Sequence, residues 1–320
     1  MTPKFQTHRV EFPPDLAGKR LDQALAQLLP QYSRSRIQRW IEEGAVKVNG
    51  LGVRARDVVT GGEAALVEAR LPPETKVVAQ DLPIDIVHQD ASIIVVNKPP
   101  GVVVHPGAGN RDKTLQNALL AHDPKLKRVP RAGLVHRIDK DTSGLLVVAR
   151  TVEAQDALVK ELGEHEIGRE YLAICTGVLT GGGTVNEPIG RHRTHRLKMA
   201  VRGDGREAVT HYRIEKRFRA HTLVRVHLET GRTHQIRVHM AHAGYPVVGD
   251  PLYGGRRRLP AGTTPELREA LERFGRQALH AAKLTLTHPK TGKRVSFDAP
   301  LPDDMKALLD LLARDAADHE

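Results

Sequence analysis

Ionisable and hydroxyl side chains are concentrated in residues 136–143, which read His-Arg-Ile-Asp-Lys-Asp-Thr-Ser. Residues 145–149 follow almost at once and form an unbroken apolar run, typical of a strand that is buried on both faces. A polar turn attached directly to such a strand holds its side chains in fixed places, as a catalytic loop requires. The carboxylates of Asp139 and Asp141 are therefore candidate catalytic groups. The residues alone also allow an ordinary charged turn, in which the same side chains cap backbone amides.

Two later segments carry further candidates. Tyr171 lies at the start of a predicted strand, where a tyrosine is most often half-buried core. Residues 221–228 contain alternating apolar side chains and predict another strand, followed by a turn and a helix. His234, His239 and His242 in that last segment suggest a metal site. No carboxylate completes a standard metal-binding motif there, and histidines are frequent in a chain that has 17 of them, so we expect no metal.

A small module is predicted ahead of these candidates. Leucines at helical spacing predict a helix over residues 21–28. A second helix is expected to follow, with Ser33 or Ser35 as its cap and Gly44 at its end. Residues 45–50 alternate as a strand and finish in an Asn-Gly turn, which is a strong hairpin signal.

Three arginines, Arg34, Arg36 and Arg39, lie at the start of the second helix or beside its apolar stripe. Positive side chains at this place suit contact with phosphate, because the free backbone amides of a helix start also attract anions. A solvated helix face is the plain alternative, and it is the more common outcome for an isolated cluster of charges.

Other basic segments extend this pattern over the chain. They are residues 123–131, 191–198 and 256–258, and the formal net charge of the whole chain is +11. Taken together, these segments favour contact with the backbone of a nucleic acid over simple solubility. Because aromatic residues make up only 3% of the chain, we expect recognition of shape and phosphate, not the stacking of many single-stranded bases.

Composition limits the class of protein further. The 320 residues are 40% hydrophobic and 27% charged, as in folded globular proteins with room for one large and one small domain. A Pro-marked segment at residues 71–83 predicts a linker and a boundary near residue 80. The single cysteine, Cys175, excludes an internal disulfide, and no apolar run approaches the about 20 residues of a membrane helix. We expect a cytoplasmic protein with no membrane association, and no cofactor, since a nucleotide-binding glycine loop is absent from the sequence.

The run from His136 to Gly144 resembles the signature of the pseudouridine synthases of the RluA family, which modify bacterial ribosomal RNA. Residues 18–62 resemble the S4 RNA-binding domain, although Gly61-Gly62-Glu63 departs from the expected Gly-Asp at its end. Further matches to the synthases follow in order along the chain: Asn97-Lys98-Pro99, Val104-His105-Pro106, Arg169-Glu170-Tyr171, Gln235-Ile236-Arg237, Asp250–Gly254 and Ala278–Ala282. The resemblance therefore covers nearly the whole chain.

This resemblance implies a fold and a reaction. The fold would be α+β, with an S4-like domain and linker in residues 1–80 and a catalytic domain in residues 81–320 built on a mixed, mostly antiparallel sheet. The reaction would be the isomerisation of uridine to pseudouridine in 23S ribosomal RNA, with the helix 69 stem-loop as the expected target. The substrate would be large-subunit ribosomal RNA or a pre-ribosomal 50S subunit. The enzyme would act as a monomer and would need neither a cofactor nor a metal.

The resemblance also assigns roles. Asp139 would be the essential carboxylate, which could attack C1′ of the sugar, attack C6 of the base or remove a C2′ proton. Tyr171 would stack on the target uracil, and Arg237 would pair with Asp139 and keep it ionised. Arg137 would fill the gap that the flipped base leaves. The S4-like arginines, Arg34, Arg36 and Arg39, would hold structured RNA.

Two residues receive minor roles, and two other classes of function stay open. We expect Lys98 to be solvated and at most supportive, and Asp141 to be structural. A non-catalytic ribosome-assembly factor on the same scaffold would bind ribosomal RNA, and Asp139→Ala would then have only a modest effect on binding. A metal-dependent hydrolase built on the histidines of residues 234–242 would lose its activity to a chelator.

Overall fold

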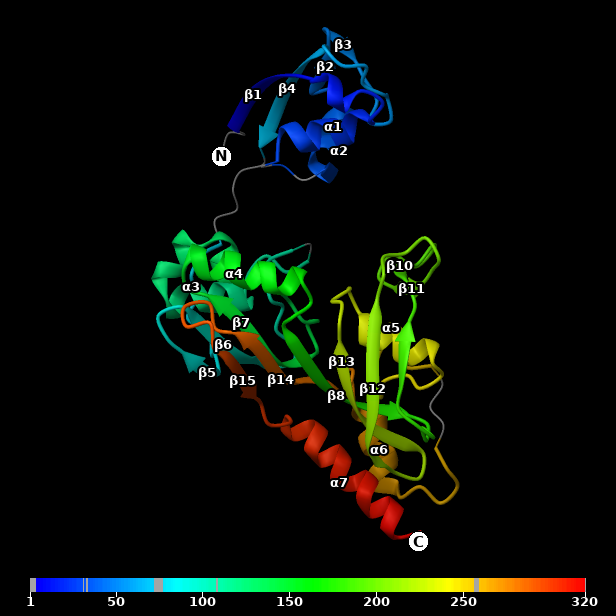
Figure 1. The fold of residues 1–320 in the computed structure, drawn as a ribbon. Coiled ribbons are helices and arrows are strands. Elements are labelled where there is room, and N and C mark those ends of the chain that lie inside the picture. The colour runs from blue at the N-terminus through cyan, green and yellow to red at the C-terminus, as the bar shows by residue number, and fades with distance from the viewer. Residues whose placement is uncertain are drawn as a thin grey trace. The chain divides into compact units, whose positions relative to one another are not determined.

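The computed structural model describes residues 4–30, 32, 34–71, 77–107, 109–255 and 259–319. The chain divides into two compact units, residues 1–76 and 77–320 (Figure 1), and each is described by itself. Two sequence predictions lie outside the described residues, the cap at Ser33 and the basic run 256–258. The predicted linker, residues 71–83, lies partly outside them, at residues 72–76. Within the described ranges, no helix combines the length and the apolar character needed to cross a membrane.

The N-terminal unit packs two helices against a four-stranded antiparallel sheet. The strand order is β1 (Lys4–Glu11), β4 (Ala64–Leu71), β2 (Val46–Val48) and β3 (Leu51–Gly52). A short 3-10 helix, η1 (Pro14–Leu16), precedes the helices α1 (Leu21–Leu28) and α2 (Arg34–Glu42). Trp40, Ile37 and Phe12 are buried in its core. The two predicted helices are confirmed, whereas strand β1 begins well before the predicted start of the module and was missed.

The larger unit is organised around one nine-stranded sheet. Its order is β5-β6-β7-β14-β8-β13-β12-β9, and β15 pairs with β14. The strands are β5 (Ile86–Gln89), β6 (Ile93–Lys98), β7 (Ser143–Ala149), β8 (Gly168–Thr176), β9 (Gly183–Asn186), β12 (Val209–Arg217), β13 (His221–Leu228), β14 (Leu279–Thr287) and β15 (Arg294–Asp298). A separate hairpin is formed by β10 (Ile189–Arg191) and β11 (Met199–Val201). The pair β7–β14 is parallel and its neighbours are antiparallel, so the prediction of a mixed, mostly antiparallel α+β fold is confirmed.

Helices flank both halves of this sheet. They are α3 (Leu115–His122), α4 (Val152–Gly163), α5 (Gln235–His242), α6 (Pro265–Arg273) and α7 (Asp303–Ala317), with 3-10 turns η2 (Pro124–Arg128) and η3 (Pro130–Gly133). Figure 1 shows α3 and α4 with strands β5–β7 in one half, and α5 with β12, β13 and the β10–β11 hairpin in the other. The C-terminal helix α7 contacts α6.

Strand β7, which directly follows the polar turn, lies inside the sheet between β6 and β14. Every residue from Ser143 to Ala149 is buried, as the apolar run predicted. Gly144 has φ 111°, and a Cβ there would lie 2.2 Å from the carbonyl oxygen of Ala281, so only glycine fits this close approach to β14. Ala281 pairs with Gly144 on one side and with Tyr171 of β8 on the other. The sheet register therefore brings the end of the polar turn and Tyr171 to the same level on β7 and β8, the two strands that flank β14.

Candidate active site

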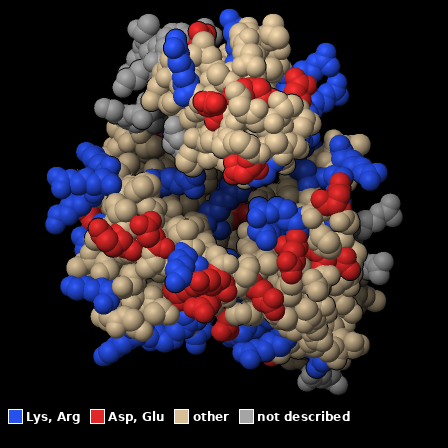
Figure 2. Space-filling view, turned by 45° about the horizontal axis from the view of Figure 1, so that its top comes forward, with Lys and Arg blue, Asp and Glu red and all other residues tan. Residues whose placement is uncertain are grey.

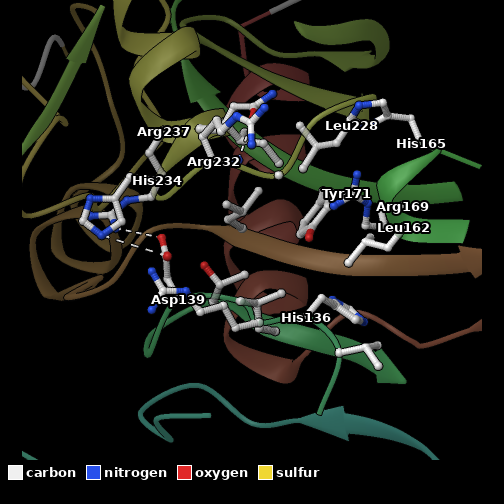
Figure 3. Close-up of a pocket in the computed structure, with 18 of the residues that line it drawn as sticks. His136, Asp139, Leu162, His165, Arg169, Tyr171, Leu228, Arg232, His234 and Arg237 are labelled. Carbon is white, nitrogen blue, oxygen red and sulfur yellow. Dashed lines mark hydrogen bonds and ion pairs between the residues drawn. The ribbon is translucent and has the colours of Figure 1, made fainter. Parts of the chain in front are cut away.

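A cavity of about 520 Å³ lies beside the polar turn (Figure 3). Most of its walls come from three parts of the chain: residues 135–142, residues 159–171 on α4 and β8, and residues 228–237 between β13 and α5. Arg206 and Leu279 complete the lining. Asp139, Tyr171, Arg237 and Arg137, which are far apart in sequence, all line it.

Asp139 is held by an arginine that also binds a second carboxylate. Arg237 Nη1 donates to Asp139 Oδ2 at 2.9 Å, as predicted. Arg237 Nε and Nη2 donate to Asp250 Oδ2 and Oδ1 at 2.6 and 2.9 Å, which is a bidentate pair. Burial alone would lower the pKa of Arg237, but the hydrogen bonds to Asp250 and the charge of Asp139 raise it above its usual range. The guanidinium is thus a permanent, rigid support for the Asp139 carboxylate.

Asp250 is the residue of this network that the sequence did not single out. Its side chain is fully buried, and Oδ1 also accepts hydrogen bonds from the backbone amides of Leu252 and Tyr253 at 2.8 and 3.0 Å. In the sequence, Asp250–Gly254 is only one of the segments that match the synthases. Its position fixes Arg237, which in turn orients Asp139, so Asp250 acts on the site through another residue.

His234 lies on the other side of Asp139. Its Nε2 is 4.0 Å from Asp139 Oδ1, and its Nδ1 is 2.9 Å from the hydroxyl of Tyr253. That hydroxyl accepts a hydrogen bond from the Met199 amide at 2.8 Å, which connects the site to the β10–β11 hairpin. His234 has φ 57°, an unusual backbone conformation for a residue with a side chain, at the start of α5. Burial lowers its pKa, against the opposing charge of Asp139, so a neutral imidazole faces the carboxylate at neutral pH.

Tyr171 enters the cavity from β8 with only 7% of its surface exposed. Burial raises the pKa of its phenol, so the hydroxyl is protonated at neutral pH. In Figure 3 the ring of Tyr171 and the carboxylate of Asp139 approach the same space from different elements. An aromatic face opposite a supported carboxylate is suited to a flat heterocyclic ring that must react at its edge.

Arg137 is exposed and sits between two cavities. Its Nη2 donates to Thr233 Oγ1 at 3.0 Å, which joins the polar turn to the segment before α5. A second cavity of about 480 Å³ shares Arg137, Asp139, His234 and Arg237 with the first. The guanidinium is therefore placed to contact a molecule that extends beyond the space beside Tyr171.

Residues 140–142 of the polar turn accept hydrogen bonds from the side chains of Lys98, Arg276 and Gln277. Lys98 Nζ donates to the carbonyl oxygens of Lys140 and Pro99, at 2.8 Å each. Arg276 Nη1 donates to the Asp141 carbonyl at 3.1 Å, and Gln277 Nε2 to Thr142 Oγ1 at 3.0 Å. The expectation of a solvated Lys98 was wrong: it is 1% exposed, because it is the last residue of the buried strand β6. Burial lowers the pKa of Lys98 to about 7.

The remaining predicted site residues lie in the N-terminal unit. Arg34 is tied to the buried carboxylate of Asp22 at 2.8 Å, so part of its role is structural. Asp22 also accepts from Arg20 and Gln38, at 3.1 and 2.5 Å. Arg39 is exposed on α2, as is Arg36.

The histidines of the alternative metal site have other partners. His239 Nδ1 and Nε2 lie 2.8 Å from Thr210 Oγ1 and 2.9 Å from the Glu187 carbonyl, whereas His234 faces Tyr253 and Asp139. Over the ranges that the structure describes, no three His, Cys, Asp or Glu side chains are grouped so as to hold a metal.

Comparison with known proteins agrees with this geometry. The family model for RNA pseudouridylate synthases matches residues 92–242, and that for the S4 domain matches residues 19–64. A protein of Xanthomonas campestris named ribosomal large subunit pseudouridine synthase D is 53% identical over 95% of this chain and 92% of its own length. The protein of the same name from Escherichia coli K12 is 53% identical over 95% of this chain and 93% of its own length. The chain belongs to the RluA-type family of RNA pseudouridine synthases.

Solved structures of pseudouridine synthases have the same fold. Human RNA pseudouridylate synthase domain containing 1 is 25% identical, has a TM-score of 0.54 and covers 73% of this chain and 96% of its own. Human RNA pseudouridylate synthase domain containing 4 has a TM-score of 0.55 at 24% identity, covering 72% of this chain and 93% of its own, and supports the fold alone. This pseudouridine synthase is thus an isomerase with an N-terminal S4 domain.

Proposed function

We propose that this synthase converts uridine to pseudouridine in large-subunit ribosomal RNA, with Asp139 as the essential carboxylate. The observation that carries the proposal is the Asp139 carboxylate, fixed by Arg237 at 2.9 Å on the wall of a cavity that also receives the Tyr171 ring. The relatives named ribosomal large subunit pseudouridine synthase D support the substrate class.

The reaction needs the target base outside the RNA helix. The glycosidic N–C bond breaks, the uracil rotates while it is held, and a C–C bond forms, with no change of oxidation state. Tyr171 stacks on the flipped uracil, and Arg137 fills the gap in the RNA. Asp139 attacks C1′, attacks C6 or removes the C2′ proton, and the geometry of the free protein is compatible with each route. Arg237 and Asp250 hold the carboxylate still during that step.

The charge of the protein suits a long polyanion. Arg137, Arg169, Arg206, Arg232 and Arg237 line the cavity, and Asp139 is the carboxylate among its described walls. Figure 2 shows Lys and Arg spread over the visible face, with Asp and Glu in groups between them. Together with the net charge of +11, this distribution supports binding along the phosphate backbone.

The finer parts of the proposal concern the target and the partners. We assign residues 1–80 to an S4-like RNA-binding domain and linker, in which Arg34, Arg36 and Arg39 contact RNA, and residues 81–320 to catalysis. The target is the helix 69 stem-loop of 23S RNA, as free RNA or within a pre-ribosomal 50S subunit. We further propose that the enzyme acts in the cytoplasm, where ribosomal RNA is made, and that it acts as a monomer.

Pseudouridine mapping tests this proposal. Free large-subunit RNA and immature 50S particles, both lacking the modification, are incubated with the protein, and new pseudouridines are located by chemical labelling and primer extension. We expect modification within helix 69. Modification confined to another stem-loop would overturn the target, and tight RNA binding without any modification would favour a ribosome-assembly factor.

A further inference from the structure

Arg169 is a buried cation with an unused hydrogen-bond donor. It lies on β8, two residues before Tyr171, and only 7% of its surface is exposed. Its Nη2 donates to the Glu229 carbonyl at 3.0 Å, whereas the buried Nε has no hydrogen-bond partner among the described residues. Burial lowers the pKa of Arg169, but an arginine remains charged at neutral pH.

The other buried arginine of this unit, Arg237, and the half-buried Arg150 and Arg202 have acidic partners. Arg237 binds Asp250 and Asp139, and Arg150 binds Asp123 at 2.8 Å. Arg202 also has an unpartnered Nε, yet its guanidinium is paired with Asp204 at 2.5 Å. Across the described ranges, no carboxylate forms an ion pair with Arg169. The guanidinium charge is also buried away from water. Such a group is costly for folding, and a ligand in the cavity that accepts a hydrogen bond from the guanidinium would offset this cost.

The position of Arg169 indicates what this ligand is. Alternate residues of a strand point to the same face, so Arg169 and Tyr171 both line the cavity, about 7 Å apart along β8. Two further arginines, Arg232 and Arg206, line the same cavity but are progressively more exposed. A phosphate group of the RNA backbone fits the exposed pair, whereas a buried donor beside a stacking ring fits the edge of the stacked base.

We propose that Arg169 is a further substrate-binding residue, which donates a hydrogen bond to a carbonyl oxygen of the target uracil held against Tyr171. The proposal rests on the uridine isomerisation proposed above. The acceptor is O2 or O4, because these are the hydrogen-bond acceptors on the edge of uracil that faces outward from a stacking ring.

This contact would also serve the chemistry. Loss of uracil from C1′, by direct displacement or after removal of the C2′ proton, leaves a uracil anion, and addition to C6 gives an enolate. In each case the new negative charge is spread over the ring carbonyls. A buried, preorganised cation at one carbonyl stabilises this charge more than that of the neutral base, so it lowers the barrier.

The test pairs a change in the enzyme with a change in the substrate. Three stem-loop RNAs carry uridine, 2-thiouridine or 4-thiouridine at the mapped target position, since a thiocarbonyl is a poor hydrogen-bond acceptor. Single-turnover rates are measured for the wild type and Arg169→Met. We expect the wild type to convert one thio-substituted RNA at least about tenfold more slowly than the uridine RNA, a difference of about 1.4 kcal/mol. Arg169→Met should convert the uridine RNA about 100-fold more slowly than the wild type does. It should convert the uridine RNA and the thio-substituted RNA that is slow for the wild type at equal rates.

Two controls separate this role from a merely structural one. Arg213→Met, at an exposed arginine on β12, should keep the wild-type discrimination between uridine and the analogue. Arg169→Lys keeps the cation and should retain part of the discrimination. If the wild type converts all three RNAs at equal rates, or if Arg169→Met keeps the full discrimination, the proposal is overturned. No pseudouridine from the uridine RNA with the wild type would instead refute the proposed function.

Discussion

Replacement of Asp250 by asparagine tests whether the site depends on the buried Arg237–Asp250 pair. The Asp250 carboxylate is fully buried and accepts two hydrogen bonds from Arg237 and two from backbone amides. Asparagine has a single acceptor oxygen and would turn its amide nitrogen toward another donor. The guanidinium of Arg237, 5% exposed in its side chain, would then keep only the partly exposed Asp139 as an acidic partner.

The expected loss of stability is large. Breaking a buried ion pair by removal of one partner costs about 3–5 kcal/mol. For a unit that spans residues 77–320, each kcal/mol lowers the melting temperature by about 2–4 °C. We therefore expect Asp250→Asn to melt about 6–20 °C below the wild type. Because Arg237 no longer has a fixed position, kcat should also fall, by about 100-fold.

Thermal unfolding followed by circular dichroism measures the first effect, and single-turnover pseudouridine formation measures the second. Asp303→Asn is the matched control, since the Asp303 side chain is fully exposed and forms an ion pair with the exposed Lys306 at 3.2 Å. This control should shift the free energy of unfolding by less than about 0.5 kcal/mol. If Asp250→Asn melts within a degree or so of Asp303→Asn, the buried pair does not stabilise the site as we infer.

Three further predictions follow from the same geometry. Burial lowers the pKa of Lys98 from 10.5 to about 7, so between about pH 7 and 10 the unfolded chain binds a proton that the folded protein does not. The free energy of unfolding of the wild type, relative to that of Lys98→Met, should therefore rise over this range by up to about 1.4 kcal/mol per pH unit. Urea unfolding measures this rise, and the exposed Lys160→Met should show no such dependence. Tyr171→Ala should weaken the productive complex with RNA by about 1–3 kcal/mol, whereas Tyr171→Phe keeps the stacking face and should leave KM unchanged; equal KM values for both variants would contradict stacking. Charge reversal at Arg36 and Arg39 should weaken RNA binding and reduce the slope of log K against log salt by about one for each lost contact, and an unchanged affinity in filter binding would refute their role.

The sequence predicted most accurately what local pattern determines. Leucine spacing located α1, and the apolar run after the polar turn located β7, because burial on both faces requires it. The Arg237–Asp139 pair came from the family resemblance, and the structure places these atoms 2.9 Å apart. The catalytic roles of both residues remain predictions.

Features that depend on tertiary packing could not be predicted. Lys98 looks like a solvated lysine at a strand end, but its ammonium group is enclosed by the turn that starts some 40 residues later, where it binds the Lys140 carbonyl. Asp250 supports Arg237 because the segment that follows α5 folds back against this helix and brings the two side chains into contact. Nothing in the sequence indicates that Arg169, unlike the buried Arg237, has no acidic partner among the residues that the structure describes. These contacts join segments that only the folded sheet brings together.

The most direct test of the account compares two neighbouring carboxylates. Asp139 lines the cavity and binds Arg237, whereas Asp141 contributes its backbone carbonyl to Arg276. Pseudouridine formed in large-subunit RNA is measured after incubation with the wild type, Asp139→Asn and Asp141→Asn. We expect product from the wild type and appreciable product from Asp141→Asn, but none from Asp139→Asn. Turnover by Asp139→Asn, or an equally complete loss in Asp141→Asn, would contradict the central role of Asp139.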